Sequence, residues 1–199
     1  MTSAAAPEEG GDVTDLVDAA DRDSVERTMD GDTQAFAGIV RRHGATLVAV
    51  CARMVADRSL GEELAQEALA RTYTSLGSWR GDGRFRHWLY RIAMNCCRDY
   101  IKAGARAERP AETFAADEPF HNRDPERELG ERELATALES AIARLPAANR
   151  EAFVLFHTEN LDYEQIHAIT GVSVSALKVR VHRARVMLKK ALADLRRAS

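Results

Sequence analysis

The chain has 199 residues, 45% of them hydrophobic and 30% charged, and a formal net charge of −3. This composition is typical of an ordinary folded protein with one or two domains. We expect a cytoplasmic protein without membrane insertion, because no apolar run approaches the roughly 18 residues of a membrane span and no signal-peptide pattern is present. Cys51, Cys96 and Cys97 form no CxxC pair, which indicates a reducing compartment. We expect buried thiols, with a redox switch as the alternative.

Charge is distributed unevenly along the chain. Residues 1–30 carry nine acidic and two basic side chains, whereas residues 176–199 carry eight basic side chains and one acidic one. This asymmetry is typical of a polyanion-binding end with an acidic tail, although either run is also compatible with a solvated face. We expect residues 1–23 to be an acidic, disordered extension.

The apolar spacing is helical almost throughout, and strand signals are nearly absent. In the first half, helices are expected over about 33–56, 60–76 and 84–103. Ser59 and Glu62 form a candidate capping box for the second of these helices. Gly104 is a candidate stop for the third.

A proline-containing acidic segment divides the chain. Residues 106–125 hold three of the five prolines and show no sustained periodicity, so we expect a flexible linker. Helices resume over about 126–143 and after Pro146, which suits a first helical turn. The predicted fold is all-α, with one helical domain over 24–105 and a second over 126–199.

The stretch LDYEQIHAITGVSVSALKVRVHRAR predicts a helix-turn-helix in the second domain. Asp162 and Gln165 are placed to cap the first helix, Gly171 to end it and Ser173 to cap the second helix. Apolar residues then repeat at a spacing of three and four, which places them on an inward face: Val174, Leu177, Val181, Ala184, Leu188, Ala191 and Leu195.

The outward positions of this second helix are small and neutral at its start and basic further along. In a helix-turn-helix the first residues of the second helix approach base edges in the major groove, while Lys and Arg neutralise phosphates. A basic helix for an acidic partner or a membrane surface is the alternative. The predicted duplex contacts are Val174, Ser175, Ala176, Lys178, Val179, Arg180, His182 and Arg183, with Arg185 as a further phosphate contact.

Residues 79–102 combine basic and aromatic side chains beside a loop with three glycines over 77–85. Basic side chains interleaved with aromatic rings suit single-stranded DNA, whose exposed bases stack on such rings. At this spacing Phe85 and Trp88 are also compatible with a core position, and Trp79 lies on the loop.

These motifs together resemble the extracytoplasmic-function (group IV) sigma factors of bacterial RNA polymerase. ELAQEALARTY is similar to region 2.2, GDGRFRHWLYRIAMNCCRDYIK to regions 2.3 and 2.4, and LPAANREAFVLFHTENLDYEQI with GVSVSALKVRVHRAR to region 4. The resemblance implies a dissociable polymerase subunit that recognises −35 and −10 promoter elements and promotes strand opening. A conventional helix-turn-helix regulator is the alternative.

The resemblance also implies site residues and partners. Glu63, Gln66 and Glu67 would contact the clamp of the largest polymerase subunit, and the second domain the flap of the second largest. An anti-sigma factor is the further partner implied; no enzymatic activity, small-molecule substrate, cofactor or metal is expected. The −10 contacts implied are Trp79, Arg80, Asp82, Arg84, Phe85, Arg86, Arg91, Asn95 and Arg98.

The chain departs from the family pattern in its helix-turn-helix. Ser175 and Ala176 stand where Gly-Thr is common, and Val179 where Ser is common. His167 occupies the position of a small alanine at which the two helices pack closely. A larger side chain there predicts either that Ala168 takes over the contact or that the helix crossing is altered.

Overall fold

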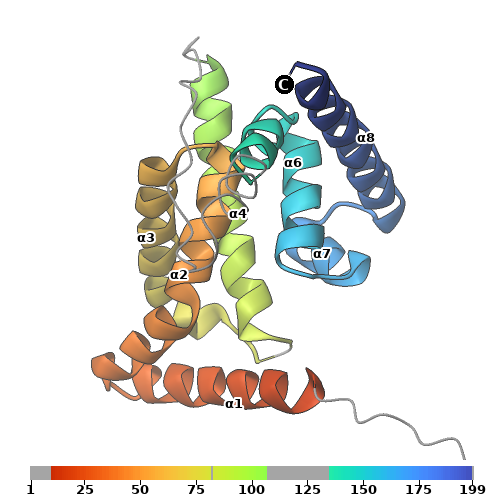
Figure 1. Ribbon diagram of the computed structural model, residues 1–199. Helices are drawn as coiled ribbons and strands as arrows, with labels where there is room; N and C mark the ends of the chain where they lie inside the picture. Colours follow the sequence, from red (N-terminus) through yellow and green to blue (C-terminus); the bar gives the residue numbers. More distant parts are fainter. Residues whose placement is uncertain (1–9, 82, 107–134, 199) are drawn as a thin grey trace, which may run out of the picture.

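The computed structural model describes residues 10–81, 83–106 and 135–198, and these ranges contain helices and no strand (Figure 1). The predicted all-α class is therefore confirmed, and none of the described helices is both long and apolar enough to cross a membrane. The N-terminal half contains α1 (Gly10–Met29), η1 (Thr33–Ala35), α2 (Phe36–Val55), α3 (Arg58–Ser75), η2 (Leu76–Ser78) and α4 (Phe85–Arg106). The C-terminal half contains a helix over 135–143, α6 (Ala147–Phe153), the π-helical turn η3 (Val154–Thr158), α7 (Tyr163–Thr170) and α8 (Val174–Ala198).

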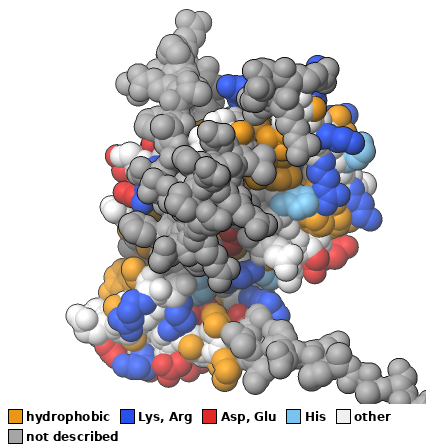
Figure 2. Space-filling view, in the orientation of Figure 1, with side chains coloured by type: hydrophobic (Ala, Val, Ile, Leu, Met, Phe, Trp, Pro, Cys, Tyr) orange, Lys and Arg blue, Asp and Glu red, His pale blue; other side chains and the backbone are white. Residues whose placement is uncertain are grey.

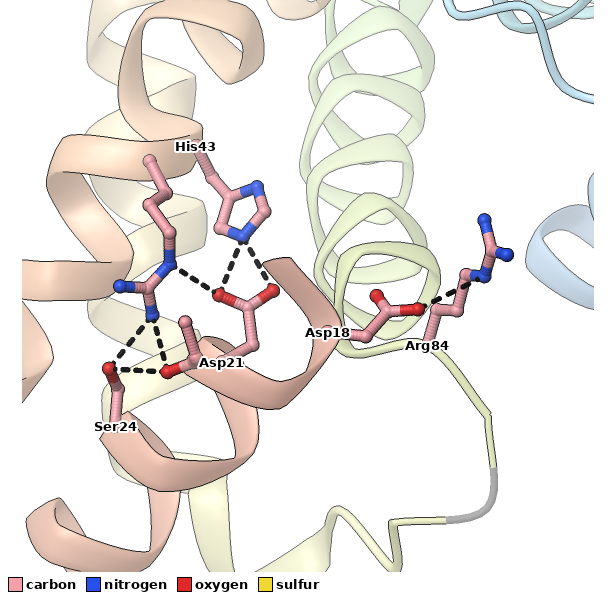
Figure 3. A network of polar contacts seen from close by, with 7 residues as sticks. Asp18, Asp21, Ser24, His43 and Arg84 are labelled. Atoms are coloured by element: carbon pink, nitrogen blue, oxygen red, sulfur yellow. Dashed lines mark hydrogen bonds and ion pairs between the residues drawn. The ribbon is translucent and has the colours of Figure 1, made fainter. Parts of the chain in front are cut away.

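The helix α1 shows that the prediction of disorder over residues 1–23 is wrong from Gly10 onward. This helix lies across one end of α2 and α4 (Figure 1). Its acids are not all solvated, because the Asp21 side chain is 0% exposed. One carboxylate oxygen accepts from Nε of Arg42 at 2.8 Å and the other from Nε2 of His43 at 2.8 Å (Figure 3). These partners compensate for the burial of a charge, which is costly without them.

The helices α2 and α3 cross at Gly61. A Cβ atom added there would lie 2.4 Å from Cα and 2.5 Å from the backbone nitrogen of Ala52. Only glycine permits the two backbones to approach this closely. The crossing completes the base on which α4 packs, with Leu47, Ala65 and Ala93 each 0% exposed in the shared core.

Two predicted helix boundaries in this half are wrong. The side chain that caps α3 is Asp57, which accepts from the backbone nitrogen of Leu60 at 3.0 Å; Ser59 lies inside the helix. Asp is as good an N-cap as Ser, and only Ala56, the C-cap of α2 with a left-handed φ of 60°, separates Asp57 from the end of α2 at Val55. Helix α4 continues through Gly104, since a single glycine costs a helix only about 1 kcal/mol.

The two halves are in contact. Helix α4 packs against α7, and α2 packs against α6 and η3 (Figure 1). One continuous set of buried apolar side chains runs through both halves, from Val25 in α1 to Leu188 in α8. The predicted linker over 106–125 and the first residues of the helix predicted over 126–143 lie outside the described residues, apart from Arg106.

Candidate nucleic-acid interface

The predicted helix-turn-helix is present, with its predicted caps. The Asp162 carboxylate accepts from the backbone nitrogen of Gln165 at 2.8 Å, and the Gln165 side chain accepts from the backbone nitrogen of Asp162 at 2.9 Å. Gly171 ends α7 with φ 72°. The Ser173 hydroxyl then accepts from the backbone nitrogen of Ala176 at 3.4 Å, at the start of α8. These local bonds fix the angle at which α8 leaves the domain.

His167 does not separate the two helices of the motif. Its side chain is exposed, and Nδ1–H donates to the backbone carbonyl of Val172 in the turn at 2.9 Å. Ala168 is also exposed, so it does not take over the contact. The buried side of the motif consists of Ile166 and Ile169 on α7 and Leu177 and Val181 on α8.

The outer face of α8 is open to solvent. Ser175, Lys178, Val179, His182 and Arg183 are exposed, and Val179 is 48% exposed although it is apolar. The remaining predicted −35 contacts, Val174, Ala176 and Arg180, are half-buried. Figure 2 shows Lys and Arg side chains gathered along this side of the molecule. The face therefore offers small side chains at the start of the helix and cations behind them.

Arg185 makes contacts inside the domain as well. Its guanidinium lies 5.4 Å from the centre of the Phe156 ring, and its Nε donates to Nε2 of His157 at 2.9 Å. Burial lowers the pKa of His157, and the positive charge of Arg185 is the second cause, so the ring is held in the neutral form that can accept this bond. Arg185 therefore stabilises the fold beside the predicted phosphate-binding surface.

The −10 contacts implied by the resemblance are spread over the loop before α4 and along this helix. Arg80 and Asn95 are exposed, and Trp79 is half-buried, with its ring edge-on to Phe85 at 5.4 Å. Phe85 is 1% exposed, so its assignment as a DNA contact is wrong in this arrangement: its ring packs between Trp79 and Trp88 as core. Asp82 lies outside the described residues.

Intramolecular partners hold the other arginines of the −10 set. Nε of Arg84 lies 3.1 Å from the Asp18 carboxylate on α1 (Figure 3). The remaining three point to the C-terminal half. Arg86 donates to the backbone carbonyl of Glu159, Arg91 to that of Ala168, and Arg98 to the Glu151 carboxylate.

Four residues that were not among the predicted site residues complete this contact region: Asp18, Tyr90, Glu151 and Glu159. The Tyr90 hydroxyl donates to the Glu159 carboxylate, and both side chains are buried. Burial raises the pKa of the Tyr90 hydroxyl, and the hydrogen bond to the Glu159 carboxylate raises it further, so the hydroxyl remains a donor at neutral pH. The signal available in the sequence was the two acidic residues, Glu151 and Glu159, at the ends of the largely apolar stretch EAFVLFHTE.

The predicted polymerase contacts share one exposed face of α3. Glu63, Gln66 and Glu67 are all exposed, at the spacing that places side chains on the same side of a helix. Glu67 also pairs with Arg71 one turn later.

The three cysteines are reduced and buried, and a hydrogen bond with Cys97, followed by burial, raises the pKa of the Cys51 thiol. Among the described residues no cluster of His, Cys, Asp and Glu could hold a metal.

The sequence matches known proteins in both halves. A family model for sigma-70 region 2 matches residues 39–107, and one for sigma-70 region 4 matches residues 135–188. The RNA polymerase sigma-H factor of Pseudomonas aeruginosa is 33% identical over 190 residues, which cover 92% of this chain and 98% of that protein. The ECF RNA polymerase sigma factor SigW of Bacillus subtilis is 31% identical over 183 residues, which cover 86% of this chain and 96% of that protein.

Solved structures share the same fold. CnrH, in complex with the cytosolic domain of CnrY, matches with a TM-score of 0.63 at 25% identity, over 88% of this chain and 98% of that chain. The sigma factor RpoE of Bartonella quintana, in complex with the anti-sigma factor NepR, matches with a TM-score of 0.66 at 22% identity, over 79% of this chain and 96% of that chain. This two-part helical protein with a helix-turn-helix is thus of the transcription-initiation class. The chain belongs to the sigma-70 family, as an alternative sigma factor of the extracytoplasmic-function group, and the predicted resemblance is confirmed.

Proposed function

We propose that this protein directs core RNA polymerase to promoters by placing α8 in the major groove of the −35 element and α4 on the unpaired −10 strand. The observation that carries the proposal is the outer face of α8. Its first turn presents the uncharged Ser175, and Lys178 and Arg183 follow, all three exposed. A neutral tip approaches base edges, whereas the cations behind it bind phosphate.

Three exposed side chains near the start of α8 each fit one part of this role. The Ser175 hydroxyl donates to or accepts from a base edge, and the apolar surface of Val179 suits a thymine methyl group. The Lys178 ammonium lies 5.8 Å from the centre of the Tyr163 ring, which keeps it beside the start of the motif, where a phosphate would pass. The His167 bond to the turn holds this tip in place.

The −10 element would be bound by α4 and the loop before it. Arg80 and Asn95 are exposed in the present arrangement, and Trp79 would offer a ring to an unpaired base. Extruding a base costs a few kcal/mol, which stacking and phosphate contacts offset. Arg84, Arg86, Arg91 and Arg98 would join once their intramolecular partners move away.

The partners proposed are core RNA polymerase, promoter DNA and an anti-sigma factor. Glu63, Gln66 and Glu67 would contact the clamp of the largest subunit, and the C-terminal half the flap of the second largest. Support for a regulatory partner comes from CnrH, which was solved in complex with the cytosolic domain of CnrY. We place this binding subunit in the cytoplasm, with no catalytic chemistry of its own.

The test is run-off transcription with purified core polymerase on promoters found by mapping transcription starts after overexpression. Ser175→Glu is expected to abolish −35-dependent transcripts, because it places a carboxylate among phosphates and base acceptors. Arg183→Ala should weaken all promoters alike and lower the salt slope of binding by about 1. Arg144→Ala, which removes an equal charge from an exposed position outside α8, should match the wild type. Normal transcription by Ser175→Glu would refute the placement of α8.

A further inference from the structure

Two aromatic rings lie stacked beside one edge of α8. Phe156 belongs to the π-helical turn η3, and Tyr163 is the first residue of α7. Their ring centroids are 4.6 Å apart with an interplanar angle of 25°, and both side chains are half-buried. The capping box of Asp162 and Gln165 fixes the backbone at Tyr163. Phe156 and Tyr163, called the ring pair below, are therefore set by local structure that precedes α8.

A cation from α8 lies over each ring of the pair. Nζ of Lys178 is 5.8 Å from the centre of the Tyr163 ring, and the guanidinium carbon of Arg185 is 5.4 Å from the centre of the Phe156 ring. Both cations are exposed. Because the face of an aromatic ring attracts a positive charge, each ring favours one position of the long side chain above it.

Arg185 is held a second time, by His157. The π-helical turn brings this residue, which directly follows Phe156, against the same arginine, and Nε of Arg185 donates to its Nε2 at 2.9 Å. The His157 ring is itself packed, with its centroid 4.6 Å from that of Phe153 and 5.0 Å from that of Phe156. The bond to His157 uses Nε, whereas the two terminal nitrogens of the guanidinium carry its other four N–H groups. Arg185 is thus fixed through one side and exposes the other.

Lys178 and Arg185 lie on one side of the strip of α8 that is proposed to read bases. They are seven residues apart, which corresponds to about two helical turns and about 10 Å along the axis. Arg183 falls on the opposite side of Val179, because each residue advances about 100° around a helix. A helix in the major groove lies between two phosphate backbones. The ring pair therefore supports the cations of one flank.

We propose that Phe156 and Tyr163 are positioning residues for −35 recognition, which hold Lys178 and Arg185 where both bind phosphates of one DNA strand. This inference rests on the proposed placement of α8 in the major groove. A long cationic side chain loses rotamer freedom when it binds a phosphate, and the rings impose part of this loss when the protein folds. Unlike a carboxylate, a ring face does not neutralise the cation, so its charge stays available to the phosphate.

The experiment measures the affinity of holoenzyme, assembled from core polymerase and the full chain, for a fluorescein-labelled promoter duplex taken from the mapped transcription starts. The variants are Phe156→Leu and Tyr163→Leu. Each is made in the wild type and in a background that lacks its own cation, Arg185→Gln for the first and Lys178→Gln for the second. Circular dichroism verifies that each variant is folded.

In the wild-type background each ring variant should lower the affinity about threefold, the factor expected for one exposed cation–π contact. In the background without its cation the same substitution should lower the affinity no further, because no side chain is left to position. In Arg183→Ala, whose cation lies on the other flank, the threefold loss should persist. Tyr163→Phe keeps the ring and should match the wild type.

Phe36→Leu is the matched control, because it removes a half-buried ring that packs against Tyr73 in the N-terminal half. This variant should bind the promoter like the wild type. If Phe156→Leu fails to fold, Tyr163→Leu with Lys178→Gln tests the ring pair from its other member.

The proposal would be overturned by an equal loss of affinity with and without the cation, since the rings would then act only by packing the domain. Unchanged affinity of both ring variants in the wild-type background would overturn it as well. A loss in Tyr163→Phe would assign the effect to the hydroxyl and refute the role of that ring. Failure of the proposed function is distinct, because it appears as the absence of run-off transcripts with the wild type and core polymerase.

Discussion

Gly61→Ala is expected to destabilise the protein by about 2 kcal/mol, although alanine is the better helix former. The added methyl carbon would lie 2.4 Å from Cα of Ala52, a backbone atom that no rotamer change can move. Helices α2 and α3 must separate, and overpacking of this kind costs about 1–3 kcal/mol or more. The gain in helix propensity returns only about 1 kcal/mol. For a chain of this length the loss corresponds to a melting temperature lower by about 4–8 °C.

Gly44→Ala is the matched control for this prediction. Gly44 lies in α2, and a Cβ atom there would meet only Cγ1 of Val40, at an ordinary contact distance of 3.8 Å. This variant should be more stable than the wild type by about 0.5–1 kcal/mol. Thermal and urea unfolding followed by circular dichroism measure both changes. If Gly61→Ala were as stable as Gly44→Ala, the close crossing of α2 and α3 would be refuted.

Two further predictions concern buried polar groups. Asp21→Ala leaves His43 and Arg42 without their shared carboxylate and should lower the free energy of unfolding by about 3 kcal/mol, measured by urea unfolding. Hydrogen exchange should show that the loss of protection is concentrated in α1. A uniform increase in exchange would contradict this prediction. Burial lowers the pKa of both His87 and His157, so the unfolded chain, with histidine pKa near 6.5, binds protons more tightly than the folded one. The contribution of these two histidines to stability should be fully present above about pH 6.5 and should fall as the pH is lowered to 5.5. The double variant His87→Gln/His157→Gln should flatten this pH dependence of the melting temperature. An unchanged pH dependence would contradict the assignment.

The parts of the fold that the sequence predicts correctly depend on neighbours close in the chain. The capping box of Asp162 and Gln165 spans three residues, and the left-handed turn at Gly171 is a property of one. The inward stripe of α8 follows from helical periodicity, and Leu177, Val181, Ala184 and Leu188 are all buried as expected. Short-range rules also limit accuracy, because Asp57 and Ser59 satisfy the same capping chemistry two residues apart.

The parts that were missed depend on partners far away in the chain. Acidic residues in α1 indicated a solvated tail, but Asp21 pairs with residues 21 and 22 positions later. Tyr90 and Glu159 are separated by 69 positions, and Arg98 and Glu151 by 53. Composition and periodicity carry no information on such pairs. The same limit explains Phe85, whose spacing suited either a core ring or a stacking platform.

The covalent connection between the two halves determines how the contact between them responds to dilution. A tethered partner is present at an effective concentration on the order of millimolar, whatever the amount of protein in the cell. Separation of the two halves is therefore a first-order equilibrium, and a low copy number does not favour it. Cutting the chain between residues 106 and 135 would turn the same contacts into a bimolecular association, which dissociates on dilution.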